Sequence, residues 1–414
     1  ISAADLAAQI AEFWAWSRDR KPDAIKVRVR PSQIGETADL RRDILEVAGP
    51  DRPFLVDSIM GEIGAQGLDV LAMFHPIVPT SEKSAESLIQ VHVEQRDAVA
   101  RKHLEEGVAA TLADVEYSTD DWADMRAAMD MAISHLEAAD TPASLEEKAE
   151  AIEFLRWIRN DHFAFLGCRN YRFDVDEKGH IQNREPDVQK GSGRGILRDP
   201  KRQVLRKLSE PSHLTPAIES FLSDSSPLIV AKANIKSRVH RRVYMDYIGV
   251  KKYRDDGVVV GEDRFVGLFT ADAYDRMARD VPLIRRKVRR VLDRAGKIPG
   301  THSEKKLRHI VENYPRDELF QTDEDDLLAI GLGILHLYDR PRTKIFIRRD
   351  RFDRFISVLL FVPRDRYNSK VREQAGEVIR DAFDGRLSAY YPQFGDGPLA
   401  RVHFIIGLNP YEHP

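Results

Sequence analysis

The segment around residues 43–66 has the residue types and spacing best suited to holding a small anion. Residues 43–48 (DILEVA) have the composition of a short strand, and the turn residues 49–53 (GPDRP) end it. After Pro53, apolar residues recur at helical spacing: Leu55, Val56, Ile59, Met60 and Ile63. The first N–H groups of a helix have no partner within it, and the helix dipole favours a carboxylate or phosphate there. The pattern predicts an anion-binding turn; the alternative is an ordinary connection between a strand and a helix that starts at proline.

Other chemistry-bearing residues do not form a recognisable catalytic or metal site. The sequence GSGRG (191–195) lacks the preceding strand and following helix of a dinucleotide loop, so we expect a mobile loop. The 13 histidines show no metal-binding spacing, and we predict no metal site. The single cysteine, Cys168, excludes an internal disulfide, and its position in a strand-like run indicates an unreactive thiol.

Two basic runs, 236–242 and 285–290, are the strongest local concentrations of charge. In the second, apolar residues are interleaved at helical spacing, so we expect its charges to form a solvated helix face. The chain as a whole has a net charge of −3, which gives no general attraction to nucleic acid or to an acidic membrane. Phosphate contact by these runs remains an alternative.

Composition indicates a globular protein with several cores. The chain has 414 residues, 42% hydrophobic and 32% charged, which corresponds to about two to four domains. No apolar run approaches the ~18 residues of a membrane-spanning helix, and no secretory signal is recognisable. We expect a cytoplasmic protein. Because the first residue is Ile1 and not Met, we expect a piece of a longer chain.

The order of the expected elements repeats a sheet-plus-helix pattern. A helix at 3–16 precedes a β-α-β-β-α series whose two later helices are expected at 96–113 and 117–138. A strand-rich region follows, then helices at 271–295, 303–313 and 322–338, and finally a β-β-α-β-β series. We therefore predict an α+β protein made of several ferredoxin-like modules, which are small antiparallel sheets backed by helices and joined by helical connectors. The predicted units are 1–140, 141–275, 276–341 and 342–414.

Six blocks of sequence, in order, carry a family resemblance. They are AGPDRPFLVDSIMGEI with HPIV, HFAFLGCRNYRF, SRVHRRVYMDYIGVKKY, RFVGLFT, YPRDELFQ, and FIRRDRFDRFISVLLFVPRDRYNS with LARVHFII. Together they resemble the N-terminal ACT-domain region of the large bacterial NAD-specific glutamate dehydrogenases, over most of the chain. The resemblance implies three ACT-type modules, with the catalytic and NAD-binding parts elsewhere in the polypeptide. No catalytic residue is therefore carried over, and NAD is expected for the full-length enzyme but not on this segment.

The resemblance also implies a ligand site and a role. By analogy with ACT domains, an amino-acid effector would be held by Gly49, Asp51, Arg52 and Pro53, with Leu55 and Val56 behind them. Helix-start N–H groups would meet its carboxylate, and Asp51 its ammonium. The expected partners are the rest of the polypeptide and other subunits of a homo-oligomer. One rival hypothesis is a structural scaffold without ligand binding; another, less favoured, is an RNA-binding protein, although the RNP1 signature is missing.

Overall fold

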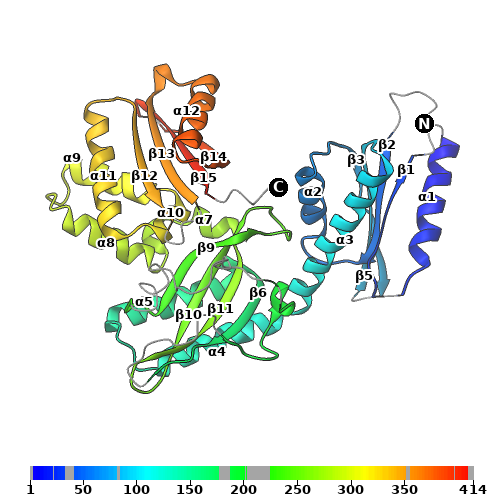
Figure 1. Cartoon of the computed structure of the whole chain (residues 1–414), viewed down its shortest axis with the longest axis horizontal. Helices are drawn as coiled ribbons and strands as arrows, with labels where there is room; N and C mark the ends of the chain where they lie inside the picture. The colour runs from blue at the N-terminus through cyan, green and yellow to red at the C-terminus, as the bar shows by residue number, and fades with distance from the viewer. Residues whose placement is uncertain are drawn as a thin grey trace.

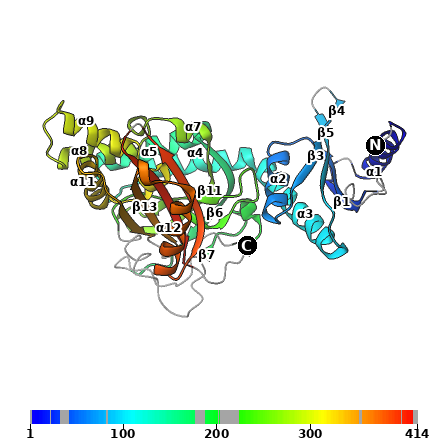
Figure 2. The same ribbon diagram turned by 90° about the horizontal axis from the view of Figure 1, so that it is seen from above.

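Three antiparallel sheets, each associated with helices, make up this computed structural model. It describes residues 3–21, 23–32, 42–81, 84–176, 187–200, 202, 224–350, 355–395 and 397–408. Figures 1 and 2 show the first sheet at one end of the long axis and the other two sheets at the opposite end. All strand pairings among the described residues are antiparallel. The predicted α+β class, with small sheets backed by helices, is confirmed.

The first sheet has the strand order β1-β2-β5-β3, with β4 paired to the start of β5. Helices α2 and α3 supply the apolar side chains that pack with its core, as in the contact of Leu45 with the cluster around Ile59. A smaller cluster joins Phe13 of α1 to Ala48 and Leu88 of the sheet. The elements are α1 (Ala3–Arg18), β1 (Lys26–Pro31), β2 (Arg42–Pro50), α2 (Leu55–Ala65), β3 (Val70–Phe74), β4 (Ile77–Ser81), β5 (Ser84–Glu94) and α3 (Ala98–Asp120).

Strand β1 was not predicted, although its sequence carries the signal of a strand. Its sequence KVRVRP alternates between charged and apolar residues, which is typical of a half-buried strand. Val27 and Val29 pack against the first core, while Arg28 and Arg30 pair with the buried Glu46 of β2. The predicted helix break near residues 114–116 was also wrong, since α3 continues to Asp120 and the chain turns at Asp121.

The middle sheet has the strand order β7-β6-β11-β10-β9, with β8 also paired to β6. Helices α4 and α5 share a core with it in which Phe154, Phe165 and Phe265 are buried. Helix α5 begins with a complete capping box, in which Ser144 and Glu147 bond each other's backbone N–H groups. The elements are α4 (Trp122–Ala138), α5 (Leu145–Trp157), η2 (Ile158–His162), β6 (Phe163–Arg172), β7 (Asp187–Val188), β8 (Arg194–Gly195), η3 (Ile196–Arg198), β9 (Leu228–Lys236), β10 (Tyr244–Tyr253), β11 (Val259–Phe269), α7 (Ala271–Asp275) and η4 (Ala278–Asp280).

A helical segment leads from the middle sheet to the third sheet, whose strand order is β12-β13-β15-β14. The helix expected over 271–295 is broken, because Pro282 lacks an N–H group and Leu283 adopts a left-handed backbone with φ 66°. The predicted β-β-α-β-β order of the third sheet is as found. The elements are α8 (Ile284–Arg294), α9 (His302–Glu312), α10 (Arg316–Gln321), α11 (Glu324–Asp339), β12 (Lys344–Arg349), β13 (Phe355–Pro363), η5 (Arg364–Arg366), α12 (Ser369–Ala382), β14 (Arg386–Phe394) and β15 (Leu399–Gly407).

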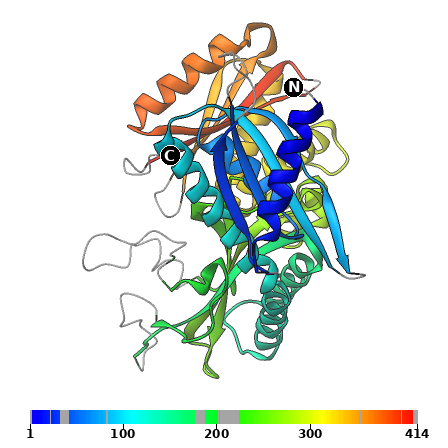
Figure 3. The same ribbon diagram turned by 90° about the vertical axis from the view of Figure 1, so that its right-hand side faces the viewer.

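Apolar clusters cross from one unit to the next. One contiguous cluster contains the first core together with Val239, Met245 and Leu268 of the middle unit. Another joins the helical segment to Leu359 and Phe361 of the third sheet. In Figure 3, seen from the end of the first unit, the third sheet lies above and the middle sheet below, both behind the first sheet. The units are thus held together by packing as well as by chain connection, while the domain boundaries drawn from the sequence stay a prediction.

Candidate functional site

The turn between β2 and α2, at residues 51–54, carries three of the six residues assigned to the effector site, Asp51, Arg52 and Pro53. Gly49 lies near the end of β2, where a Cβ atom would come within 3.0 Å of Ile25 Cγ1. The structure therefore gives this glycine a packing role next to β1. Pro53 and Asp51 are exposed, whereas Leu55 is only 4% exposed and belongs to the first core, with Val56 packed against it.

Asp51 ties the turn to strand β5. Its Oδ1 accepts a hydrogen bond from Ser87 Oγ at 2.5 Å, and its N–H donates to the Ala85 carbonyl at 2.9 Å. Ser87 is buried, and His75 Nε2 lies 3.0 Å from the same hydroxyl oxygen. Asp51 is thus fixed in position, with an exposed carboxylate whose Oδ1 is already hydrogen-bonded.

Arg52 connects the turn to the end of helix α3. Its Nη1 donates to Thr119 Oγ1 at 3.0 Å and to Asp120, and its Nη2 lies 3.6 Å from Glu116 Oε1. The side chain is 17% exposed, which leaves part of the guanidinium accessible. Arg52 therefore has carboxylate partners within the chain, and these partners were not predicted from the sequence.

The start of helix α2 has the geometry expected of an anion-binding helix terminus. Phe54 precedes it in a left-handed conformation with φ 71°, and no side chain caps the helix. The first helical hydrogen bond runs from the Ser58 N–H to the Phe54 carbonyl at 3.0 Å, so the earlier N–H groups have no acceptor within the helix. The turn thus carries backbone donors, the Asp51 carboxylate and the Arg52 guanidinium, which are the kinds of group that bind a zwitterion. Asp51 is bonded to β5 and Arg52 to the end of α3.

The outer side of α2 is bonded to the middle unit through residues 237–243, which we call the docking loop. The ring Nδ1 of His240 lies 2.9 Å from Asp57 Oδ2, and its backbone N–H donates to Ser58 Oγ at 2.9 Å. The centroid of the His240 ring lies 5.1 Å from that of the Phe54 ring. One helical turn further on, Arg242 pairs with Glu62. This use of the first basic run was not predicted. The acidic face of α2 was visible in the sequence, but nothing there identified its partner.

Glu62 is the buried centre of this contact. It is 6% exposed and accepts hydrogen bonds from Gln66 at 2.9 Å, from Thr111 at 3.1 Å and from Arg242. Burial alone would raise the pKa of Glu62, but these hydrogen bonds and the Arg242 charge outweigh it and hold the pKa below its usual value. Glu62 is therefore an ionised anchor between the first and middle units.

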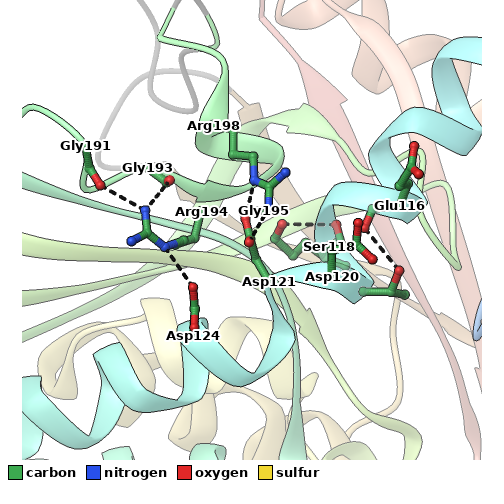
Figure 4. Close-up of polar contacts among 12 residues, drawn as sticks. Glu116, Ser118, Asp120, Asp121, Asp124, Gly191, Gly193, Arg194, Gly195 and Arg198 are labelled. Carbon is green, nitrogen blue, oxygen red and sulfur yellow. Dashed lines mark hydrogen bonds and ion pairs between the residues drawn. The ribbon is translucent and has the colours of Figure 1, made fainter. Parts of the chain in front are cut away.

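The joint between α3 and α4 is built around Asp121, as Figure 4 shows. Its Oδ2 accepts from the Gly195 N–H at 2.7 Å and from Arg198 Nε at 2.6 Å. Burial opposes the charged form of Asp121, but the bonds from Arg198 and Gly195 outweigh it and lower the pKa. Arg194 reaches Asp124 of α4 at 3.2 Å.

The glycine-rich sequence 191–195, predicted to be a mobile loop, begins at a turn, leads into strand β8 and takes part in this joint. Arg194 and Gly195 form β8 and pair with β6. Gly195 has φ 59°, and a Cβ atom there would lie 2.1 Å from the Leu166 carbonyl oxygen. Glycine is required because the backbone comes so close to strand β6.

The second basic run, predicted to be a solvated face, is also used internally. Arg285 bonds Glu150 at 2.8 Å, and Arg286 pairs with Glu147 at 2.9 Å. Arg289 pairs with Glu146 of the same helix, α5. The positive face of α8 therefore binds the negative face of α5, and most of these charges have carboxylate partners.

The remaining candidate residues give no sign of reactive chemistry. Cys168 is 2% exposed, and burial raises the pKa of its thiol to about 12, which agrees with the predicted unreactive thiol. In the described part of the chain, no cluster of three or more His, Cys, Asp or Glu residues could hold a metal ion. Within the same residues, no helix combines the length and hydrophobicity needed to cross a membrane.

Three family models match the chain. Residues 1–129 match the model described as glutamate dehydrogenase, ACT1 domain, and residues 344–414 match the ACT2 domain. Residues 281–340 match the glutamate dehydrogenase helical motif 1. The ACT2 description therefore falls on the third sheet, and the middle sheet lies between the ACT1 and helical-motif matches.

Similar proteins include NAD-specific glutamate dehydrogenases from three bacteria. The one from Halomonas elongata is 32% identical over 427 residues, which cover 98% of this chain and 26% of that protein. The one from Pseudomonas aeruginosa is 30% identical, covering 88% of this chain and 23% of that protein. The one from Mycobacterium tuberculosis is 27% identical over 88% of this chain and 22% of its own length. The chain thus spans about a quarter of the length of these relatives.

Proposed function

Since the chain belongs to the NAD-specific glutamate dehydrogenase family and represents its N-terminal ACT-domain region, we propose that it is a regulatory and assembly segment. The whole enzyme would oxidise L-glutamate with NAD and water to 2-oxoglutarate, ammonia and NADH. In this proposal the first sheet and its helices bind an amino-acid effector at the turn 51–54. The other units transmit the bound state and provide contacts within a homo-oligomer.

We place the NAD chemistry outside this segment. The nearest candidate for a dinucleotide loop, residues 191–195, does not fit a pyrophosphate group. The Gly195 N–H already donates to Asp121, and a three-residue turn follows it where a dinucleotide site needs a helix start.

The observation that carries the proposal is that the turn is bonded to the parts that would transmit a signal. Arg52 holds the end of α3 immediately before the Asp121 joint. On the other side, Asp57 and Ser58 in the first turns of α2 bond His240 of the docking loop. A ligand that bonds the helix start and Arg52 would therefore act on both connections to the middle unit. Coupling between such sites typically amounts to ~1–3 kcal/mol.

Isothermal titration calorimetry of the chain with a panel of the 20 amino acids tests this proposal. We expect one or a few to bind, and we expect Asp51→Asn and Arg52→Gln to weaken that binding roughly tenfold or more, because each removes a charged hydrogen-bonding partner. Arg254→Gln is the matched control, since the one carboxylate partner of Arg254 among the described residues is Asp256, in a hairpin of the middle sheet. Gly49 is unsuitable for this test, because a larger residue would press on Ile25.

An absence of heat with every amino acid, or equal affinity in the Asp51 and control variants, would remove the effector role. The scaffold hypothesis would then stand alone.

The scaffold hypothesis has a specific observation of its own. Strand β3 lies at an edge of the first sheet and exposes Leu71, Met73 and Phe74, at 54%, 41% and 53%. Exposed apolar edge strands are sites at which sheets pair with another chain. Sedimentation velocity of the wild type and of a Met73→Lys, Phe74→Glu double variant tests it. Loss of the oligomer in the variant supports an assembly role for β3, and an unchanged distribution refutes it.

A further inference from the structure

A cavity of about 650 Å³ lies between the middle sheet, helix α10 and the third sheet, far along the chain from the turn 51–54. Its walls come from β9 and the docking loop, from α7 and α10, and from the face of β14 and β15 opposite α12. These helices and strands are labelled in Figure 1. Small-molecule sites in proteins typically enclose about 300–1,000 Å³ and often lie where units meet. The cavity has the size and the location of a ligand site.

Three arginines that line the cavity have no carboxylate partner among the described residues. Arg241 donates to the Phe269 carbonyl at 2.6 Å, Arg316 donates to the Arg276 carbonyl, and Arg401 donates to the Asn313 carbonyl at 3.0 Å. The Nε atoms of Arg241 and Arg316 and the Nη1 atom of Arg316 are buried without a hydrogen-bond acceptor. Burial lowers the pKa of Arg316 and of Arg401. Partly buried guanidinium groups bonded only to neutral oxygens leave a positive potential that an anion would neutralise.

The two carboxylates on the wall are already occupied. Asp317 accepts from Tyr274 at 2.8 Å and lies 3.1 Å from Lys232 Nζ. Glu318 makes a two-pronged pair with Arg348 at 2.7 and 2.8 Å. Both carboxylates therefore have hydrogen-bonded partners other than the three arginines, although the charge of Asp317 also acts on Arg316.

The cavity also has an aromatic and apolar part. Tyr244, Tyr274 and Tyr391 line it, together with Phe355 and Ile405. Tyr391 is 56% exposed, so its ring is accessible for stacking. Arginine clusters recognise phosphate groups, and aromatic side chains stack on bases. The combination favours a ligand with several negative charges and a flat ring over a small polycarboxylate, which would use the arginines alone.

We propose that this cavity binds a nucleotide, with its phosphates on Arg241, Arg316 and Arg401 and its base against Tyr391. The site is separate from the effector turn, and the docking loop connects the two. Arg241 lines the cavity, while the neighbouring Arg242 pairs with Glu62 of α2. A bound nucleotide would hold the third sheet against the middle sheet and would fix the docking loop that reaches the first unit. The site is therefore placed to regulate the arrangement of the units.

Calorimetry of the chain with ATP, tripolyphosphate, adenosine and citrate tests the assignment. We expect ATP to bind, tripolyphosphate to bind more weakly, and adenosine not to bind at millimolar concentration. Arg316→Gln and Arg401→Gln should each weaken ATP and tripolyphosphate roughly tenfold or more. Tyr391→Ala should weaken ATP by roughly tenfold and leave tripolyphosphate unchanged, a split that a folding defect would not produce. The control is again Arg254→Gln, which should give the same result as the wild type with each of the four probes.

Hydrogen exchange provides the second measurement, because ATP should protect β14, β15 and α10 but not α2 to the same extent. Failure of ATP to bind at millimolar concentration overturns the proposal, as does ATP binding that is unchanged in both arginine variants. Citrate binding as tight as ATP, with no effect of Tyr391→Ala, would overturn the nucleotide assignment. The amino-acid test depends on Asp51 in another unit, so the two proposals fail separately.

Discussion

The buried pair of Glu318 and Arg348 offers the clearest quantitative test of how the third sheet is held. The side chains are 2% and 7% exposed, and both carboxylate oxygens accept from the guanidinium, at 2.7 and 2.8 Å. Burial opposes the charged form of Arg348, but the bonds to Glu318 outweigh it and raise its pKa. The pair joins α10, a wall of the cavity, to strand β12.

Replacing one partner leaves the other charge buried and unpaired. Loss of one member of a buried ion pair costs about 3–5 kcal/mol, whereas exchange of both for apolar residues is often close to neutral. We therefore expect Glu318→Gln to speed hydrogen exchange in β12 by about two to three and a half powers of ten, at ~1.4 kcal/mol per tenfold change. The double variant Glu318→Leu, Arg348→Met should recover most of the protection.

The matched control is Arg372→Gln, which breaks a more exposed pair with Glu373 in the same unit and should change exchange by less than about fivefold. The reasoning is refuted if Glu318→Gln leaves β12 exchange within twofold of the wild type. It is also refuted if the double variant exchanges as fast as the single one, because the cost would then not come from an unpaired charge.

Three further predictions concern other contacts. Burial lowers the pKa of His403 in the folded chain, so the unfolded chain takes up this proton at a higher pH than the folded chain does. The free energy of unfolding should therefore fall as the pH drops below the ordinary histidine value of about 6.5. His403→Gln should flatten this dependence in thermal unfolding between pH 7 and 5. Gly195→Ala should lower the free energy of unfolding in urea titrations by more than ~2 kcal/mol, because the new Cβ would clash with the Leu166 carbonyl oxygen. Gly191→Ala is the control. Its Cβ would meet open space, so it should cost only the ~1–2 kcal/mol of an alanine in the left-handed conformation. Because the positive face of α8 is paired with α5, we expect it not to bind RNA. In filter binding at 50–200 mM salt, the wild type and Arg289→Gln should therefore retain the same amount of RNA.

Much of the fold could be predicted from the sequence. Periodicity and turn residues gave the α+β class, the β-β-α-β-β order of the third sheet and the start of α2 near Pro53. The errors arose where a local pattern was ambiguous or overlooked. Strand β1 had a clear alternation that was not used, and Pro282 should have signalled the break before α8.

The candidate site was less predictable than the fold. The turn 49–56 was chosen from local signals and family analogy, and its ligand role stays a prediction. Its internal partners were not visible, since Arg52 bonds Asp120 and Asp51 bonds Ser87 across 68 and 36 positions. The cavity was not predicted, because its arginines come from three separate segments. Arg241 belongs to the first basic run, but nothing in the sequence places it beside Arg316 and Arg401.

By itself, the sequence determined the local elements and the family resemblance, because hydrophobic period, turn residues and short blocks of characteristic sequence need no long-range information. Only the tertiary structure decided which charges meet. Arg242 and Glu62 lie 180 positions apart, and any of several acidic helix faces could have attracted the same basic run. Electrostatic attraction by itself does not select one carboxylate among several. The apolar packing that brings the docking loop onto α2 therefore decides which partner Arg242 meets.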